Sequence, residues 1–472
     1  MNAALKKRKI DFTEGPIFFK MLMFALPLMM TSLLQQLYNT ADNIVVGRWS
    51  GDDLALAAVG CTSAMTSMMV NFVIGIGVGS GVVIAQAFGA KDYKYLSRAV
   101  HTAVTFSAIG GAVFGALGFI VARPALVLLG TDPLILEKAT LYFRIICLGV
   151  PGICVYNYAA SILRAVGDSK TPFFALSASG VLNVLLNLFF VIVCKMSVAG
   201  VAIATIISQY ASAVAVMWPL FSRREECYAV SVKKLGIDKG ILTRVLKFGI
   251  PAGFQSLIIG FSNALLQTAI NTFPPAAVSA KTISMNFENL AYSMINSFHH
   301  TTISVVAQNY GAGQPKRIRR AFIFSLLQVA IFGIIITQII LLFKGPLAAL
   351  YIDAGNEQRA DILAYSMEFM TITLQYYFIC GLMESFSGTL RGYGNSFVPM
   401  ICSIIGMCGT RIFWVEFIFP LEYFNNARGL YMVYPVSWTV TLLFDAAALG
   451  IYLIYKKHND KIRLKSTASL TK

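Results

Sequence analysis

Charged residues are scarce in this sequence. Only 13% of its 472 residues are Asp, Glu, Lys or Arg, whereas 57% are hydrophobic, and a soluble domain carries roughly twice that charged share. Such a chain has too little polar surface to cover a water-soluble fold. The composition also excludes a disordered chain, a collagen-like chain and a small disulfide scaffold. It predicts an all-α membrane protein with many spanning helices.

Several chemical motifs are missing as well. The eight cysteines include no C-x-x-C pair, and seven lie in or beside apolar runs, which predicts free thiols and no metal site. The glycine run 75–81 has no following Lys-Ser/Thr, so it predicts close helix packing and no nucleotide site. No His, Asp, Glu or Ser cluster has a catalytic spacing. We therefore expect neither an enzyme nor a bound cofactor, and no cleavable signal peptide.

Basic residues outnumber acidic ones by 38 to 22, which gives a net charge of +16. They lie in short connections between long apolar runs and not on one amphipathic face, and no zinc-finger or RNA-binding signature accompanies them. We therefore expect a lipid bilayer and no nucleic acid as partner. The distribution is typical of loops that face the cytoplasm.

Apolar runs long enough to cross a bilayer number twelve, since a span needs about 20 residues. They cover residues 21–46, 55–86, 98–122, 139–162, 172–194, 198–221, 246–271, 278–308, 321–343, 362–390, 397–419 and 431–455. With this count, the N-terminus, the even-numbered loops and the C-terminal tail hold 26 of the 38 Lys and Arg residues. The asymmetry predicts a multi-pass protein of the cell (inner) membrane with both termini cytoplasmic.

The chain also repeats itself. The matching segments are FALP at 24–27 with FGIP at 248–251, AQAFGA at 85–90 with AQNYGA at 307–312, and LRAVGDS at 163–169 with LRGYGNS at 390–396. The offsets of 224, 222 and 227 define two units of six spans each. Because six is even, both units start on the same side, so the repeat is parallel.

This repeat predicts four regions along the chain. Residues 1–221 form an N-terminal six-helix lobe, 222–245 a basic cytoplasmic linker, 246–456 a C-terminal six-helix lobe and 457–472 a cytoplasmic tail. Two homologous bundles suggest a transporter that alternates access by rocking one bundle against the other. With no nucleotide site, an ion gradient would drive transport.

Polar residues inside spans are costly and are candidates for function. In the first span, Asn39 and Asp42 share one helical face with Gln35. Asp42 lies toward the outer end of its span, so its carboxylate either faces a cavity or sits at the wet interface. Asn183 and Asn187 share a face of the fifth span, where they either serve a site or only join helices by hydrogen bonds.

The second lobe has its own set of polar residues. Glu288 and Tyr292 lie on the most polar span, which predicts a water-lined helix, and Glu384 lies on the tenth span. Arg411 needs a counter-charge, which Glu384 or Asp445 could supply. We regard Glu288, Tyr292, Glu384 and Arg411 as cavity candidates, with a structural ion pair as the alternative for Arg411.

These segments resemble the multidrug and toxic compound extrusion (MATE) family of efflux antiporters, over about residues 20–455. The resemblance rests on the 27–49 stretch that contains Asp42, the Ala-Gln-x-x-Gly-Ala and Leu-Arg-x-x-Gly-x-Ser elements, and the 199–205 run that ends at Thr205. It implies a twelve-helix, V-shaped fold of two lobes. It also implies export of amphipathic or cationic small molecules and drugs in exchange for protons or sodium, by a monomer.

The resemblance further implies an ion site at Asp42, Asn183, Asn187 and Thr205. Some branches carry a second aspartate where this chain has Asn187, so Asp42 is the one titratable group in that cluster and the coupling ion stays open between H⁺ and Na⁺. Protonation of Asp42 would loosen its hydrogen bonds to Asn39, Asn183 or Asn187 and bias the first helix near Pro27, a built-in kink.

Two other functions compete with this one. A lipid-linked precursor flippase of the same superfamily would need a large basic cavity, whereas the spans hold more acids than bases, with Arg411 the one clear mid-span cation. An ion channel, from a different class, is disfavoured because no filter-like repeat is present. Single-channel currents would favour it.

Overall fold

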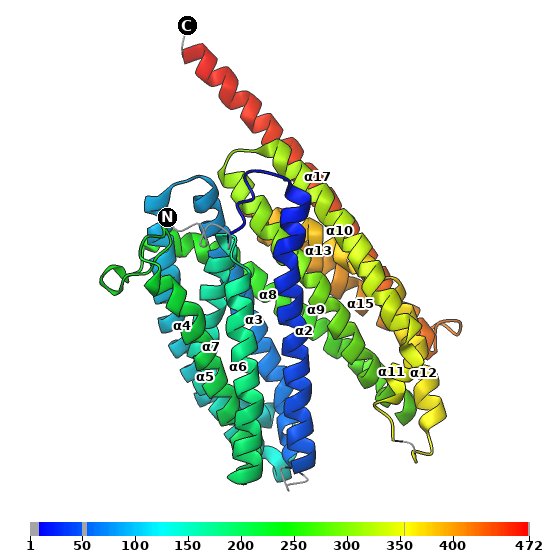
Figure 1. Ribbon diagram of the computed structural model, residues 1–472. Helices are drawn as coiled ribbons and strands as arrows, with labels where there is room; N and C mark the ends of the chain where they lie inside the picture. Colours follow the sequence, from blue (N-terminus) through cyan, green and yellow to red (C-terminus); the bar gives the residue numbers. More distant parts are fainter. Residues whose placement is uncertain (1–8, 50–53, 354, 471–472) are drawn as a thin grey trace. The chain divides into compact units, whose positions relative to one another are not determined.

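The computed structural model describes residues 9–49, 54–353 and 355–470. Within these ranges, the side chains of 39–49, 55–56, 64 and 459–470 lie outside the described part. All twelve predicted spans are helical (Figure 1). They are α2 (Ile17–Trp49), α3 (Ala55–Gly89), α4 (Tyr93–Leu128), α5 (Pro133–Ala165), α6 (Lys170–Leu188) with η1 (Phe189–Val193), α7 (Ser197–Ser222), α8 (Lys239–Ile270), α9 (Pro275–Gly311), α10 (Pro315–Leu342), α12 (Arg359–Gln375) with α13 (Tyr377–Gly392), α14 (Phe397–Ser403) with η3 (Ile404–Gly409), α15 (Thr410–Phe413) and η4 (Trp414–Ile418), and α16 (Ala427–Tyr431) with α17 (Val433–Leu470).

Ten of these segments are long and apolar enough to cross a membrane, among the residues that the structure describes. The other two are α9, which carries many polar residues, and the α12–α13 segment, which is interrupted at Tyr376. Two short elements lie outside the spans, a 3₁₀ turn η2 (Val232–Lys234) and α11 (Lys344–Ala349). The protein is therefore a multi-pass, all-helical membrane protein.

The short connections are closed by helix caps. Asp92 accepts a hydrogen bond from the Tyr95 amide (3.0 Å) at the start of α4, and Asp132 accepts one from the Leu134 amide (2.8 Å) at the start of α5. Such caps satisfy amide groups that have no partner inside the helix. Two consecutive long helices can thus be separated by only a few residues.

Related spans of the two repeats end in the same distorted geometry. The fifth span finishes in the π-helical segment η1, and the eleventh contains the π-helical segments η3 and η4. Pi-helical turns are rare and often mark functional positions. Their presence at matching places in both halves agrees with the internal repeat.

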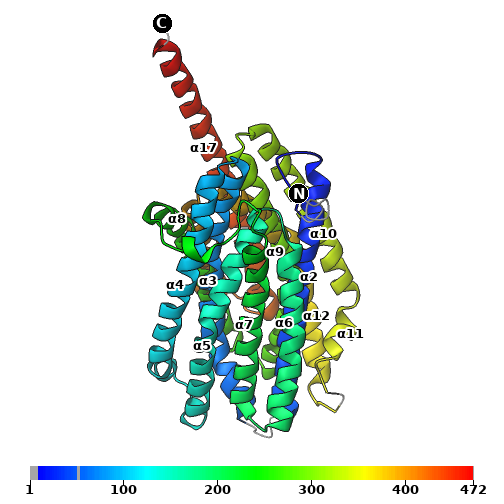
Figure 2. The ribbon, with the colours of Figure 1, turned by 60° about the vertical axis from the view of Figure 1, so that its left-hand side comes forward.

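The described chain divides into two compact units. Unit 1 comprises Met1–Gly260, Ser293–Ser325 and Gly392–Gly394, and unit 2 comprises Phe261–Tyr292, Leu326–Arg391 and Asn395–Lys472. In unit 1, α5 packs against α3, α4 and α7, and α6 packs against α2 and α7. Figures 1 and 2 both show α2 and α6 running side by side. The lobe boundaries predicted from the repeat stay a prediction.

The glycine run in α3 is a packing surface, as predicted. A Cβ atom on Gly75 would lie 2.5 Å from the backbone of Gly253, and one on Gly79 would meet the backbone of Gly249 at 2.6 Å. Gly253 and Gly249 both belong to α8. The two helices therefore approach closely because neither carries a side chain at these contacts.

The repeat motifs contact one another inside unit 1. Gln86, at the end of α3, donates its side-chain amide to the carbonyl of Gly392 at 3.0 Å, and Gln308, at the end of α9, donates to the carbonyl of Ala165 at 2.7 Å. Gly89 and Gly311 lie in direct contact with the backbones of Gln308 and Gln86, respectively. Each repeat therefore holds the end of the other repeat's fourth span.

An N-terminal strap, residues 9–15, crosses this junction. The Ile10 amide donates to the carbonyl of Gly167 (3.0 Å), and the Phe12 amide donates to the side-chain oxygen of Gln308 (3.1 Å). Phe12 is fully buried. Gly167 has φ +88°, and a Cβ there would overlap the Ile10 carbonyl, so both its conformation and its space require glycine.

The predicted linker also packs onto the strap. Lys9 forms an ion pair with Glu226 and places its ammonium 4.4 Å from the centre of the Tyr228 ring. Burial raises the pKa of the neighbouring Cys227 thiol, and the Lys9 ammonium lowers it only in part. The strap and linker thus form one layer over the helix ends of unit 1.

Candidate functional site

The predicted first-lobe site includes buried amides on α6. Asn183 and Asn187 are both buried, and the Asn187 amide donates to the Asn183 side-chain oxygen at 3.4 Å. Thr205, half-buried on α7, donates its hydroxyl to the carbonyl of Val201 at 2.9 Å. The side chains of Asn39 and Asp42 lie outside the described residues, so their contacts stay a prediction.

A contact between α2 and α6 lies next to these amides. The Tyr38 hydroxyl donates to the carbonyl of Ser177 at 3.1 Å, and its ring lies directly against Gly180. Gly180 is three residues before Asn183, and Tyr38 is four residues before Asp42. The contact therefore sets the register of α2 along α6 at this level.

The predicted kink lies within a continuous helix. Helix α2 runs from Ile17 to Trp49 with Pro27 inside it. The Thr31 hydroxyl donates to the Pro27 carbonyl at 2.7 Å, which gives that carbonyl a partner inside the helix. Whether Pro27 acts as a hinge stays a prediction.

The interior of unit 2 holds a buried charged network. Glu288 accepts hydrogen bonds from Ser284 (2.7 Å) and Thr373 (3.1 Å), and Lys281 lies 3.9 Å from its second oxygen. The Lys281 ammonium also donates to the Tyr434 hydroxyl at 2.8 Å. Lys281 is 4% exposed, so its charge depends on these partners.

Arg411 is a second buried cation in this unit. It is 2% exposed and donates to Ser262 (3.2 Å), Asn263 (2.7 Å) and Ser437 (3.3 Å). None of the ion pairs found among the described residues includes Arg411. The predicted pairing of Arg411 with Glu384 or Asp445 is therefore wrong, because neutral oxygens surround the guanidinium.

An aromatic ring joins the two cations. The Tyr434 ring has the Lys281 ammonium 4.8 Å and the Arg411 guanidinium 4.9 Å from its centre. The sequence analysis missed Lys281 and Tyr434 and counted one mid-span cation instead of two. The spacing of seven between Lys281 and Glu288, which places both on one face of α9, was the available signal.

A separate polar group lies in the same unit. Tyr292 is hydrogen-bonded to Glu384, which is buried on α13. Arg391, seven residues further along α13, interacts electrostatically with Glu384 and with Asp445 of α17. Tyr292 and Glu384, two of the predicted cavity candidates, therefore lie next to each other. Arg391 and Asp445, which were not among those candidates, interact with the same group.

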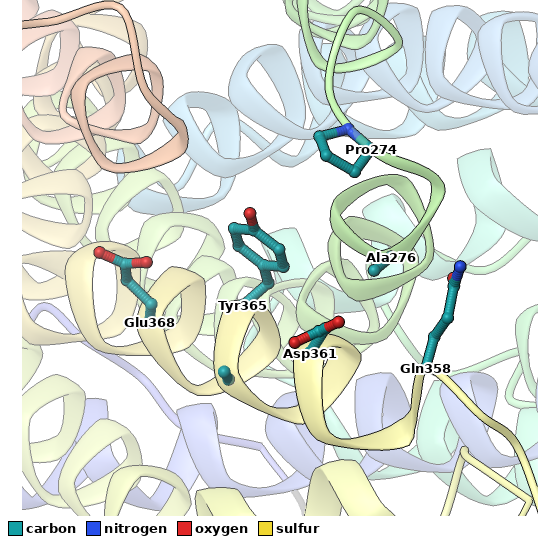
Figure 3. Close-up of a pocket in the computed structure, with 7 residues that line it drawn as sticks. Pro274, Ala276, Gln358, Asp361, Tyr365 and Glu368 are labelled. Carbon is teal, nitrogen blue, oxygen red and sulfur yellow. The ribbon is translucent and has the colours of Figure 1, made fainter.

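A surface pocket opens elsewhere in unit 2. It has a volume of about 460 Å³ and is lined by Pro274 and Ala276 before and in α9, and by one face of α12. Figure 3 shows Asp361, Tyr365 and Glu368 on successive turns of that face. No predicted site residue lines this pocket.

Metal binding finds no support in the described part of the chain, where no group of three or more His, Cys, Asp or Glu side chains is arranged for it. His299 and His300 lie edge to face, with ring centres 5.6 Å apart. All eight cysteines are free thiols.

These features define a class of protein. Twelve helical spans in two related halves, with buried ionisable groups inside the helices, are the architecture of a secondary transporter. Nothing in the buried networks has the geometry of a nucleotide site or of a catalytic centre among the residues that the structure describes.

The comparison with family models identifies the particular family. The MatE family model matches residues 27–189 and 251–414, one match in each repeat, so the chain belongs to the MatE family. It is a membrane transporter of the MATE type and not an enzyme.

Named relatives cover nearly the whole chain. The chain is 28% identical over 460 residues to the "Probable multidrug resistance protein YoeA" of Bacillus subtilis, covering 96% of this chain and 97% of that protein. It is 23% identical over 465 residues to the "Multidrug export protein MepA" of Staphylococcus aureus, with 97% of each chain covered.

Solved structures share the fold. An outward-facing multidrug resistance MATE transporter superposes with a TM-score of 0.81 at 20% identity, covering 96% of this chain and 98% of that one. A transporter of the MOP superfamily from Pyrococcus furiosus superposes with a TM-score of 0.84 at 20% identity, covering 93% and 96%. The predicted twelve-helix, two-lobed fold is confirmed by this similarity.

Proposed function

We propose that this protein is a multidrug efflux antiporter of the cell membrane that exports amphipathic or cationic small molecules in exchange for protons or sodium. It works as a monomer of two lobes, residues 1–221 and 246–456, with both termini in the cytoplasm. The names of its relatives support the substrate class, and the distribution of Lys and Arg supports the orientation.

The observation that carries the coupling is the register between α2 and α6. Both helices run in the same direction across the membrane in this topology. Moving one turn along α2 from Tyr38 leads to Asp42, and moving one to two turns along α6 from Gly180 leads to Asn183 and Asn187. This register supports the proposal that Asp42 lies at the level of two buried amides, which would hydrogen-bond its carboxyl group.

The chemistry follows from that placement. A carboxyl group held away from bulk water binds a proton more readily, and neutral amides can bond to either of its protonation states. Proton entry neutralises Asp42, changes its bonds to Asn39, Asn183 and Asn187, and biases α2 near Pro27. Proton and substrate then compete because they favour different states of the transporter.

The second candidate is a lipid-linked precursor flippase. The observation that favours it is the pair of buried cations Lys281 and Arg411 on either side of the Tyr434 ring, of which only Lys281 lies within ion-pair distance of a carboxylate, Glu288. A pyrophosphate would be attracted by such a surplus of positive charge. Transport of a fluorescent lipid-linked pyrophosphate in proteoliposomes would favour the flippase. Transport of ethidium, with no transport of the lipid-linked pyrophosphate, would favour the antiporter.

The coupling is tested with inverted membrane vesicles. Ethidium accumulation is measured after an imposed proton gradient and then after an imposed sodium gradient. We expect Asp42→Asn to abolish gradient-driven accumulation while the protein keeps its thermal unfolding midpoint. The matched control is Asp353→Asn, which changes an exposed carboxylate. Wild-type accumulation by Asp42→Asn would remove this carboxyl group from the coupling.

A further inference from the structure

Asp445 is a carboxyl group buried within the last span. It lies on α17 (Val433–Leu470), twelve residues from the start of that helix, and is 1% exposed. Neither of its oxygens has a hydrogen-bond partner among the described residues, although the Cys402 thiol lies close by. An ionised carboxylate in such a place would be strongly destabilised.

The charges around Asp445 do not offset an ionised form. Arg391 interacts electrostatically with Asp445, and it also interacts with Glu384 on its own helix. One cation thus faces two carboxyl groups, Glu384 and Asp445. If Asp445 were ionised, its carboxylate would have to share Arg391 with Glu384 in a low-dielectric interior.

The other charged side chains described near α17 lie further along the helix or are bonded elsewhere. On the elements packed against α17, the remaining titratable or charged side chains include Cys402 on α14, Cys408 on η3, Arg411 on α15 and Arg428 on α16. Arg411 is bonded to Ser437, which lies eight residues and about 12 Å before Asp445 along the helix. From α9, Lys281 reaches Tyr434, which is further still.

The geometry points to Asp445 as a second proton-carrying group of the transporter, which works together with Glu384 and Arg391. This inference rests on the proposed ion-coupled efflux. When unit 2 admits water, the O–H bond of the carboxyl group breaks, the electron pair stays on the oxygen and water takes the proton. The new carboxylate then competes with Glu384 for Arg391.

A proton suits this place better than a sodium ion. Sodium is a hard cation that needs several oxygen ligands, as other hard cations do. The group close to the Asp445 oxygens is a thiol, which is a poor ligand for such an ion. The carboxyl group can carry its proton without any such shell.

The protonation state is tested directly by infrared spectroscopy. The purified full-length protein in lipid is compared with Asp445→Asn and with the exposed-carboxylate control Asp353→Asn. We expect a carbonyl stretch of a protonated carboxylic acid, shifted in D₂O, that disappears in Asp445→Asn and persists in the control. A spectrum that Asp445→Asn leaves unchanged would show that Asp445 is ionised and overturn the inference.

Its role in transport is tested with ethidium in inverted vesicles under an imposed proton gradient. We expect Asp445→Asn to reduce accumulation to the level of ionophore-treated vesicles, whereas Asp445→Glu, which can still carry a proton, restores part of it. Wild-type accumulation by Asp445→Asn, together with loss in Asp42→Asn, would reject this inference and leave the proposed function intact. No gradient-driven accumulation by the wild type would reject the proposed function, while the infrared result would still decide the state of Asp445.

Discussion

Gln86 and Gln308 occupy equivalent positions in the two repeats, and each donates its side-chain amide to the backbone end of the other repeat's fourth span, at Gly392 and Ala165 respectively. The side-chain oxygens of both glutamines also accept hydrogen bonds. Arg244 donates to Gln86 at 3.3 Å, and the Phe12 amide donates to Gln308 at 3.1 Å. These four hydrogen bonds of Gln86 and Gln308 hold the two repeats together at the end of unit 1 where the strap lies, and we call them the glutamine lock.

Removing either glutamine side chain should weaken this lock. Gln308→Ala leaves a buried carbonyl and a buried amide without these partners, and each such loss costs about 1–3 kcal/mol. Gln86→Ala should have a smaller effect, because Arg244 lies at a part-buried position where water can replace its partner. The thermal unfolding midpoint in detergent measures both. Gln267→Ala, which removes an exposed bond within one helix, is the control, and equal midpoints for all three variants would contradict the lock.

Adding a methyl group at the same junction tests its packing. A Cβ on Gly89 would overlap the Gln308 backbone, and one on Gly311 would overlap the Gln86 backbone. Gly89→Ala should therefore force α3 and α9 apart and destabilise the protein, with an overpacking cost of roughly 1–3 kcal/mol. Gly60→Ala in the same helix α3 meets nothing within 4 Å and should be neutral or slightly stabilising. Unfolding midpoints distinguish the two, and a neutral Gly89→Ala would show that the helices can separate without cost.

The helices and the repeat could be predicted from the sequence, but the partners of its polar groups could not. Apolar runs of about 20 residues and the alternation of basic loops set the spans, and all of them are helical. The repeat motifs identified equivalent positions in the two repeats, but they did not predict that Gln86 would contact Gly392 or that Gln308 would contact Ala165. That contact depends on how the two halves pack, which no local pattern encodes.

The charged residues show the same limit. Arg411 was expected to need a carboxylate, yet Ser262, Asn263 and Ser437 surround it. Hydrogen-bonding groups from two other helices, α8 and α17, converge on it, and sequence spacing relates residues only within one helix. Lys281 and Glu288 share a helix face, so their pairing could have been predicted from the sequence.

The N-terminal strap should protect Cys227 from alkylation. Burial raises the pKa of this thiol above its ordinary value of 9.0, so little reactive thiolate exists at pH 7 and the rate should rise with pH. Phe12→Ala removes the buried anchor of the strap and should speed the reaction of N-ethylmaleimide with Cys227 in a chain that keeps only this cysteine. Phe19→Ala, which changes an exposed ring nearby, is the control. Equal rates in both variants would show that the strap does not cover the thiol.

The ion pair between Lys281 and Glu288 should behave as a unit. Lys281→Met leaves the buried Glu288 carboxyl group without its cation, and removing one partner of a buried pair costs about 3–5 kcal/mol. Glu288→Gln leaves two cations at Tyr434 with no carboxylate, so it should also destabilise. The double variant removes both charges, and its loss should be smaller than the sum of the single losses by about 0.5–3 kcal/mol. Unfolding midpoints of the three variants measure this coupling, with Lys94→Met as the control for loss of an exposed lysine. Additive losses would mean that the 3.9 Å contact contributes nothing and that Tyr434, which accepts the Lys281 hydrogen bond, alone holds the ammonium group in place.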